Sequence, residues 1–131
     1  MPRYELSVTH RPNRDGAPVT SRHVPYYLAA EVFSDAWART LADLGPGVLT
    51  AKDVAVVGAR FDYSHEVFTG TAAVTVDVQE VGGSSIRFGL QFEQDGRVAA
   101  VGTTTVARTD KLRTRAIPLS ARQRDALEAI R

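Results

Sequence analysis

The sequence predicts an α+β fold in which an antiparallel five-stranded sheet wraps around one long central helix, with a short C-terminal helix. Two observations support this prediction. Only one long segment of the 131 residues, from Pro25 to Leu44, has helical apolar spacing and a clear stop signal. Most of the remaining chain alternates apolar and polar residues with the period of a strand. Because one long helix must cover the apolar face of the sheet, the sheet is expected to curve around it.

The N-terminal part predicts a strand, a loop and then the long helix. Arg3 to His10 alternates apolar and polar side chains, and the prolines, Asn, Asp and Gly of residues 11–18 are typical of a loop. The helix stops at Gly45-Pro46-Gly47, because a glycine tolerates the left-handed conformation and a proline cannot continue the helix. Its apolar stripe, which we expect to face the core, is Tyr26, Ala30, Phe33, Trp37, Leu41 and Leu44.

Four further strands are expected in the second half. The dipeptides Gly82-Gly83 and Asp95-Gly96 are hairpin signals, so the strands on either side of each should pair. Ser120 and Gln123 have the spacing of a capping box, which predicts a helix from Ser120 through Ile130. The four expected strands are Val54–Glu66, Thr71–Val81, Ser84–Gln94 and Arg97–Thr109.

Composition excludes several classes of protein. A hydrophobic fraction of 44% and a charged fraction of 24% are those of a globular chain, and the length suits one domain over residues 1–131. The net charge of +1 argues against nucleic acid as a partner, and the absence of cysteine excludes thiolate chemistry. The aliphatic runs are too short to span a membrane, and Met1-Pro2-Arg3-Tyr4-Glu5 lacks a signal-peptide core. We therefore expect a cytoplasmic protein.

Basic residues are concentrated after the last strand. Residues 108–131 hold seven basic and three acidic side chains. In an extended chain Lys111, Arg113 and Arg115 would lie on one side of the backbone, because alternate residues share a face. This segment is either a solvated exit from the sheet or a row of cations that binds phosphate.

The ordered pattern resembles the hotdog-fold acyl-CoA thioesterases, specifically the 4-hydroxybenzoyl-CoA thioesterase-like group. The resemblance runs from Tyr4 to about Leu119. The residues that carry it are Arg22-His23-Val24-Pro25-Tyr26, Phe33-Ser34-Asp35-Ala36-Trp37, Asp62-Tyr63, Gly70-Thr71, Gly82-Gly83-Ser84-Ser85-Ile86, Ala99 to Val106, and Asp110. It implies hydrolysis of an acyl thioester carried by coenzyme A or a carrier protein, without a cofactor, in a homodimer or homotetramer.

The chain departs from the family pattern at several positions. Many relatives have an Asp a few residues before the motif His, whereas here the nearest acid is Asp15, which would align only with an insertion. Arg22 replaces the motif Gly, and Ser34 replaces the helix Glu. The resemblance therefore leaves open which residue activates water.

The candidate catalytic residues gather at the start of the long helix. Unpaired N–H groups there would stabilise an oxyanion, and an imidazole beside them could polarise a carbonyl or orient water. We assign this role to His23, assisted by Asp15, Arg22 and Tyr26, although the helix stripe favours Tyr26 as a core residue. Glu31 either faces solvent or a partner subunit, or serves as a base. The expected substrate-binding residues are Tyr27, Ser34, Asp62, His65, Ser84, Lys111 and Arg113.

Two other functions remain open. The first is non-catalytic binding of an acyl thioester, because the usual Asp is not in register. The second is a hotdog hydratase, although Asp62 and His65 lack the spacing of its acid–base pair. The scattered histidines have no zinc-ligand spacing, so no metal is expected.

Overall fold

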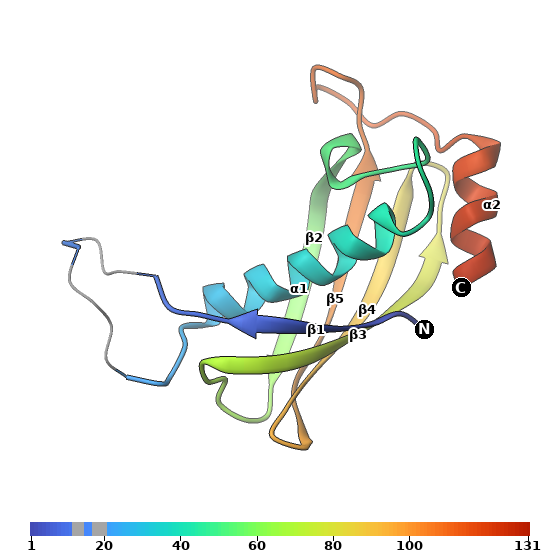
Figure 1. Cartoon of the computed structure of the whole chain (residues 1–131). Helices are drawn as coiled ribbons and strands as arrows, with labels where there is room; N and C mark the ends of the chain where they lie inside the picture. Colours follow the sequence, from blue (N-terminus) through green and yellow to red (C-terminus); the bar gives the residue numbers. More distant parts are fainter. Residues whose placement is uncertain (12–14, 17–20) are drawn as a thin grey trace.

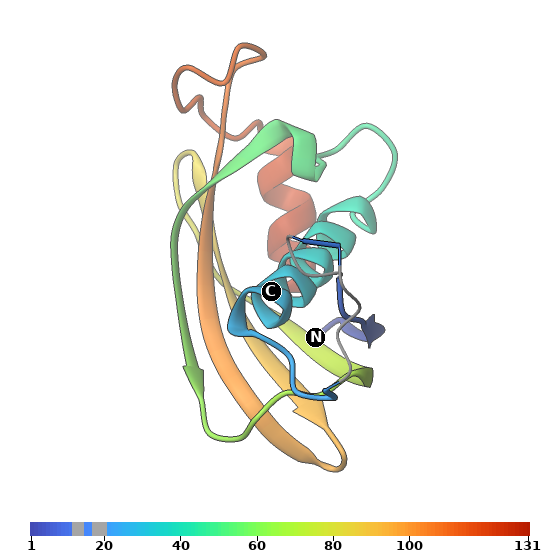
Figure 2. The same ribbon diagram turned by 90° about the vertical axis from the view of Figure 1, so that its left-hand side faces the viewer.

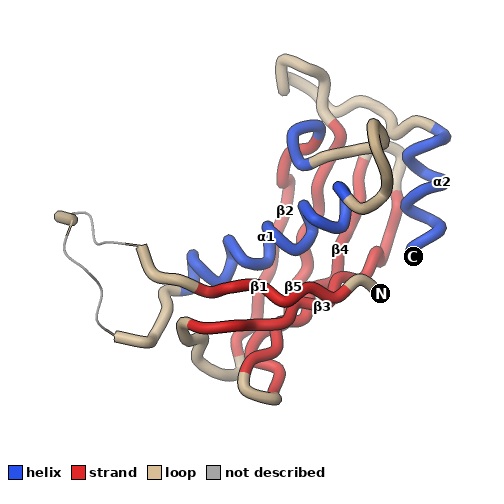
Figure 3. Tube along the Cα trace, viewed as in Figure 1, coloured by secondary structure: helices blue, strands red, loops and turns tan. Residues whose placement is uncertain are grey.

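The computed structural model describes residues 1–11, 15–16 and 21–131, so part of the predicted loop lies outside the described residues. It confirms the predicted architecture of five antiparallel strands, one long helix and a C-terminal helix (Figures 1 and 3). The strands lie in the order β1-β3-β4-β5-β2. The elements are β1 (Arg3–Val8), α1 (Tyr26–Ala42), the 3₁₀ turn η1 (Ala51–Asp53), β2 (Val54–Tyr63), β3 (Gly70–Val81), β4 (Ser85–Gln94), β5 (Arg97–Arg108) and α2 (Ala121–Ile130).

Both predicted hairpins are confirmed. β3 pairs with β4, and β4 pairs with β5 across a turn in which Asp95 and Gly96 both have positive φ angles, of 54° and 78°. Such a turn matches the twist of the strands it joins. β2 ends at Tyr63, earlier than the predicted Glu66, because the N–H groups of Ser64 and His65 both turn to the carbonyl of Ala99.

The helix α1 lies against the inner face of the sheet, which curves around it (Figure 2). The Phe33 ring stacks on Phe61 with ring centroids 4.6 Å apart and meets the edge of Phe92 at 5.7 Å. Trp37 stacks on Phe88 at 6.1 Å. The alternating apolar residues of the central strands are buried as predicted, namely Ala72, Val74, Val76, Val78, Ile86, Phe88, Leu90 and Phe92.

The buried side of α1 differs from the predicted stripe. Phe33, Trp37 and Leu41 are buried as expected, but Tyr26 is 66% exposed and is not a core residue. Leu44 lies beyond the end of α1 and is only partly buried. Because strands lie on more than one side of the helix, its buried surface is broader than a single stripe and also includes Leu28, Ala29, Val32, Ala36 and Thr40.

The C-terminal helix α2 begins with the predicted capping box. Ser120 accepts a hydrogen bond from the Gln123 N–H, and the Gln123 side chain accepts one from the Ser120 N–H. The helix packs against β3, buries Leu127, and brings the Arg131 guanidinium to the carbonyl of Gln79 at 3.0 Å. It thus lies along the part of β3 that β1 does not pair with.

We predict that Trp37→Ala lowers the free energy of unfolding by about 3–5 kcal/mol, the usual cost of removing a large aromatic side chain from a core. Trp37 is 6% exposed and lies against Phe88. Urea denaturation of both proteins measures the difference. Tyr27→Ala on the same helix is the matched control, because Tyr27 is 64% exposed and its loss should change stability little. Equal losses for the two variants would contradict the assigned packing.

Candidate functional site

A short antiparallel pairing holds the segment that leads into α1. The Val24 N–H donates to the carbonyl of Val67 at 2.9 Å, and the Thr69 N–H donates to that of Arg22 at 2.9 Å. Between them His23 forms a backbone bridge with Phe68. This pairing places His23 beside the loop that follows β2, three residues before the first residue of α1.

The His23 side chain has contacts on two sides. Its Nδ1 atom contacts the Oε2 atom of Glu66, and its ring lies against Phe68 with centroids 4.9 Å apart. The guanidinium of Arg22 lies over the same Phe68 ring at 5.8 Å. The imidazole is nevertheless 62% exposed, so a ligand can reach it.

A hollow of about 270 Å³ lies at the N-terminus of α1 and is lined by His23, Val24, Pro25, Tyr26, Glu66 and Val67. Pro25 precedes the helix in an extended conformation and makes no side-chain cap. The first N–H groups of a helix have no partner within it and carry partial positive charge. Their place beside His23 suits an oxygen atom that gains negative charge.

Tyr26, which lines this hollow, lies against Tyr63. The Tyr26 ring lies 4.5 Å from the Tyr63 ring, and the Tyr63 hydroxyl donates to the Tyr26 carbonyl at 3.4 Å. Burial, followed by the proximity of Tyr26, raises the pKa of Tyr63. The Tyr63 side chain thereby links the end of β2 to the first turn of α1.

A buried amide anchors the loop that carries Glu66. The Gln94 side chain donates to the carbonyl of Phe68 at 2.8 Å and accepts from its N–H at 2.9 Å. Gln94 is only 6% exposed, so these bonds are protected from water. Neither Glu66 nor Gln94 is among the residues predicted from the sequence. Glu66 is adjacent to the candidate His65 and Gln94 precedes a hairpin turn, but no local pattern connects either residue with His23.

Other predicted site residues lie around this region in different settings. Asp15 is exposed, and residues 12–14 and 17–20 on either side of Asp15 and Gly16 lie outside the described residues. Tyr27 is exposed on the first turn of α1, while the Ser34 hydroxyl donates to the Ala30 carbonyl of the same helix at 3.1 Å. His65 is exposed and follows the end of β2.

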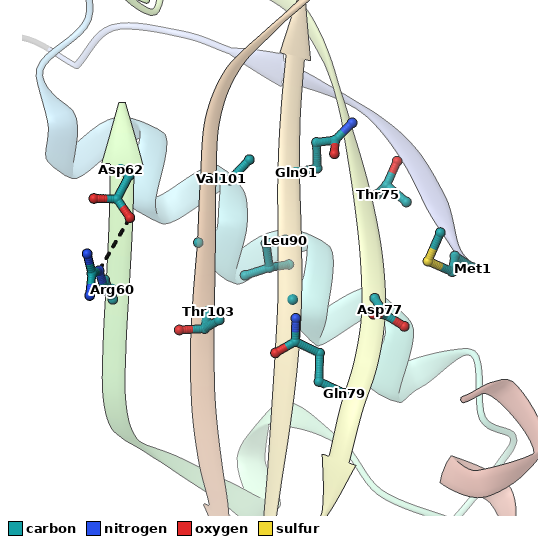
Figure 4. Close-up of a pocket in the computed structure, with 12 residues that line it drawn as sticks. Met1, Arg60, Asp62, Thr75, Asp77, Gln79, Leu90, Gln91, Val101 and Thr103 are labelled. Atoms are coloured by element: carbon teal, nitrogen blue, oxygen red, sulfur yellow. Dashed lines mark hydrogen bonds and ion pairs between the residues drawn. The ribbon is translucent and has the colours of Figure 1, made fainter. Parts of the chain in front are cut away.

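Asp62 faces the side of the sheet opposite α1, in a broader hollow of about 520 Å³ (Figure 4). Its carboxylate pairs with Arg60 at 3.3 Å. Thr103 and Gln91 also line this hollow. Asp62 therefore does not lie beside His23 within one chain.

Ser84, Lys111 and Arg113 lie at the other end of the sheet. β2 runs from the Val54 end to the Tyr63 end over nine residue steps, about 30 Å at the usual rise per residue. The Ser84 carbonyl accepts a hydrogen bond from the N–H of Arg108, the last residue of β5. These three residues and His23 are thus far apart within one chain.

The expected extended row of Lys111, Arg113 and Arg115 is wrong. Residues 110–115 form a turn closed by a backbone bridge between Thr109 and Ala116, and Arg113 has a φ of 57°. The Thr114 hydroxyl and N–H donate to the Asp110 carboxylate, and these bonds lower its pKa. The Arg113 guanidinium donates to the carbonyls of Lys52 and Val54 at 2.9 and 2.8 Å.

Within the described part of the chain, no three His, Cys, Asp or Glu side chains come together as a metal site would require. No described helix has the length and apolar character needed to cross a membrane.

No family model and no curated protein matches the chain. Among solved structures, a thioesterase from Thermus thermophilus in complex with coenzyme A and zinc is 22% identical, with a TM-score of 0.80 over 98% of this chain and 92% of that one. A gentisyl-coenzyme A thioesterase is 19% identical, with a TM-score of 0.75 over 96% and 99% of the two chains. A hypothetical protein from Staphylococcus aureus in complex with coenzyme A is 14% identical, with a TM-score of 0.78 over 98% and 82%.

These similarities confirm the hotdog fold that the sequence pattern predicts. Thioesterases are among the proteins that share it, as the resemblance implied. At 14–22% identity the comparison establishes the fold, and residue roles must be argued from the geometry of this chain.

We predict that Gln94→Leu lowers the free energy of unfolding by about 1–3 kcal/mol, because the Phe68 N–H and carbonyl lose their side-chain partner. Gln91→Leu is the matched control, since the Gln91 amide donates to the Glu93 side chain on the same strand and ties no loop to the sheet. Chemical denaturation measures the free energy of unfolding of both variants. A Gln91 variant that loses as much stability as the Gln94 variant would contradict the anchoring role.

Proposed function

We propose that the protein hydrolyses an acyl thioester, carried by coenzyme A or by an acyl-carrier protein, to a free acid and a thiol. The observation that carries the proposal is the exposed His23 imidazole at the N-terminal end of α1, in a hollow large enough for a thioester group. Coenzyme A in two structures of similar fold supports this choice of substrate.

In the proposed reaction the thioester carbonyl oxygen lies against the first N–H groups of α1. The Nε2 atom of His23 takes a proton from water, and the resulting hydroxide forms a bond to the carbonyl carbon. The helix N–H groups stabilise the tetrahedral oxyanion. When the intermediate collapses, the C–S bond breaks and the imidazolium returns the proton to the thiolate. Arg22 or Asp15 orients the water or completes the site, and Tyr26 borders the carbonyl.

The acyl chain is proposed to run along α1 between subunits, past Tyr27 and Ser34. The phosphates of coenzyme A would then bind basic residues. Lys111 suits this role better than Arg113, whose guanidinium is bonded to two backbone carbonyls. Since Lys111 lies at the far end of the sheet from His23 in one chain, it would have to come from a second copy.

A homodimer paired through β2 would meet this requirement. β2 forms an edge of the sheet, and Val56 and Val57 on it are 52% and 64% exposed. A long edge strand with exposed apolar side chains is a ready template for pairing with another strand. Antiparallel pairing of two β2 strands about a two-fold axis brings the Lys111 end of one copy toward the His23 end of the other. A homotetramer would be a pair of such dimers.

The proposal is tested by release of free thiol from a panel of acyl-CoA and acyl-pantetheine thioesters. A hydrolase releases thiol catalytically, whereas a non-catalytic binder retains the intact thioester, which is then detected by calorimetry. Hydration of an enoyl thioester without thiol release would indicate the hydratase alternative.

We predict that His23→Ala lowers kcat about 10²–10⁴-fold, the usual contribution of a general base. The free energy of unfolding of the His23→Ala variant should change little, because the His23 side chain is largely exposed. Steady-state kinetics and a thermal melt of the same preparations separate the two effects. A lowered melting temperature with unchanged kinetics would make His23 structural.

We predict a stable dimer at micromolar concentration, measured by light scattering, and its conversion to a monomer by Val57→Lys. The lysine would place a charge in the apolar strand pairing, while the isolated chain would tolerate it at this exposed position. Ala129→Lys is the control, because Ala129 is exposed on α2, which packs against β3 and lies away from the β2 edge. A parent protein that is monomeric would contradict the pairing.

A further inference from the structure

The contact between Glu66 and His23 has no role in the reaction outlined above. Both side chains are more than 60% exposed, at 64% and 62%, so packing does not force them together. The contact joins a carboxylate oxygen to the Nδ1 atom and leaves Nε2 without this partner.

The ring nitrogen that Glu66 contacts determines what the other can do. A neutral imidazole carries one proton, and the hydrogen bond of one nitrogen decides which of the two holds it. A carboxylate only accepts hydrogen bonds, so Nδ1 must carry the proton that is donated to Glu66. Nε2 is then the nitrogen with a lone pair, as a general base requires. When Nε2 gains a proton from water, the same carboxylate stabilises the imidazolium by charge.

The backbone around the pair supports this orientation. His23 and Glu66 lie on the two segments joined by the bonds from Val24 to Val67 and from Thr69 to Arg22. Phe68, which contacts one side of the imidazole, is fixed through its backbone by the buried Gln94 amide. The loop that supplies Glu66 is thereby tied to β4, which keeps the backbone of Glu66 close to His23.

Two sources of positive charge also lie in this part of the structure. The Arg22 guanidinium lies over the Phe68 ring in the same pairing. The positive end of the α1 dipole lies at Pro25, which lines the same hollow as Glu66.

We propose that Glu66 is a positioning residue that holds His23 with Nδ1 protonated and Nε2 available as the base. The catalytic part of this inference rests on the proposed thioester hydrolysis, whereas the tautomer is a property of the resting protein. The two parts can therefore be tested separately.

The first test is proton–nitrogen correlation NMR of the imidazole rings at a pH where they are neutral. His23 should show a protonated Nδ1 and an unprotonated Nε2, and Glu66→Ala should abolish this preference. His65 serves as an internal reference, and His23→Gln assigns the signal. A His23 ring that is protonated at Nε2 in the parent, or unchanged in Glu66→Ala, would overturn the proposal whether or not the protein is a hydrolase.

The second test is kinetic. Glu66→Ala should lower kcat by about tenfold or more with KM nearly unchanged, because an orienting residue acts in the transition state more than on bound substrate. Glu66→Asp should recover part of the loss, and Glu5→Gln, a change at an exposed glutamate on β1, should have no effect. In a His23→Ala background the loss from Glu66→Ala should vanish, since contacting residues are coupled.

Each kinetic outcome has one meaning. Unchanged kcat in Glu66→Ala, or an undiminished loss in the His23→Ala background, would refute the positioning role. A parent protein that releases no thiol would refute the proposed function, while the NMR result would still decide the tautomer.

Discussion

The position of α1 within the curved sheet determines most of what the structure can do. Phe33 of α1 stacks on Phe61 of β2, and Trp37 of α1 stacks on Phe88 of β4. These contacts fix the direction and rotation of the helix. Its N-terminus consequently lies where β2 ends, and the hydrogen bond from Tyr63 to the Tyr26 carbonyl ties the two together. The candidate oxyanion site therefore depends on the aromatic packing of the core.

The arginines of the C-terminal segment have a structural role that charge counting does not reveal. Five of them donate hydrogen bonds to backbone carbonyls, most of which lie in loops and turns. Such bonds give backbone carbonyls in turns and at strand ends a hydrogen-bond donor. The pairs are Arg108 with Pro118, Arg113 with Lys52 and Val54, Arg122 with Pro46, Arg124 with Gly82, and Arg131 with Gln79. The basic character of this segment thus serves in large part to hold turns and helix α2 in place.

The sequence could predict those features that depend on residues close together along the chain. The stop signal after α1, the Asp95-Gly96 turn and the Ser120 cap depend on neighbouring residues, and the structure confirms all three. His23 could be nominated because it lies just before the helix start. Glu66 and Gln94 could not be nominated in this way. Glu66 contacts His23, and Gln94 contacts Phe68, only because the fold brings distant segments together. The helical period also predicts Tyr26 as a core residue, although its side chain is exposed. The period gives the direction of the apolar stripe but not how far the sheet extends over it.

The two edges of the sheet differ in a way that limits how copies of the chain can assemble. β1 is short, carries Arg3 and Glu5, and lies beside α1, where its Tyr4 hydroxyl donates to Asp43 at 2.8 Å. The remaining length of β3 lies under α2. β2, in contrast, offers ten residues with exposed valines. A subunit with two open edge strands could pair with further copies at both edges and grow into a filament. A subunit with one open edge strand has no open edge left after a single two-fold contact. The asymmetry therefore favours a closed assembly over open-ended growth.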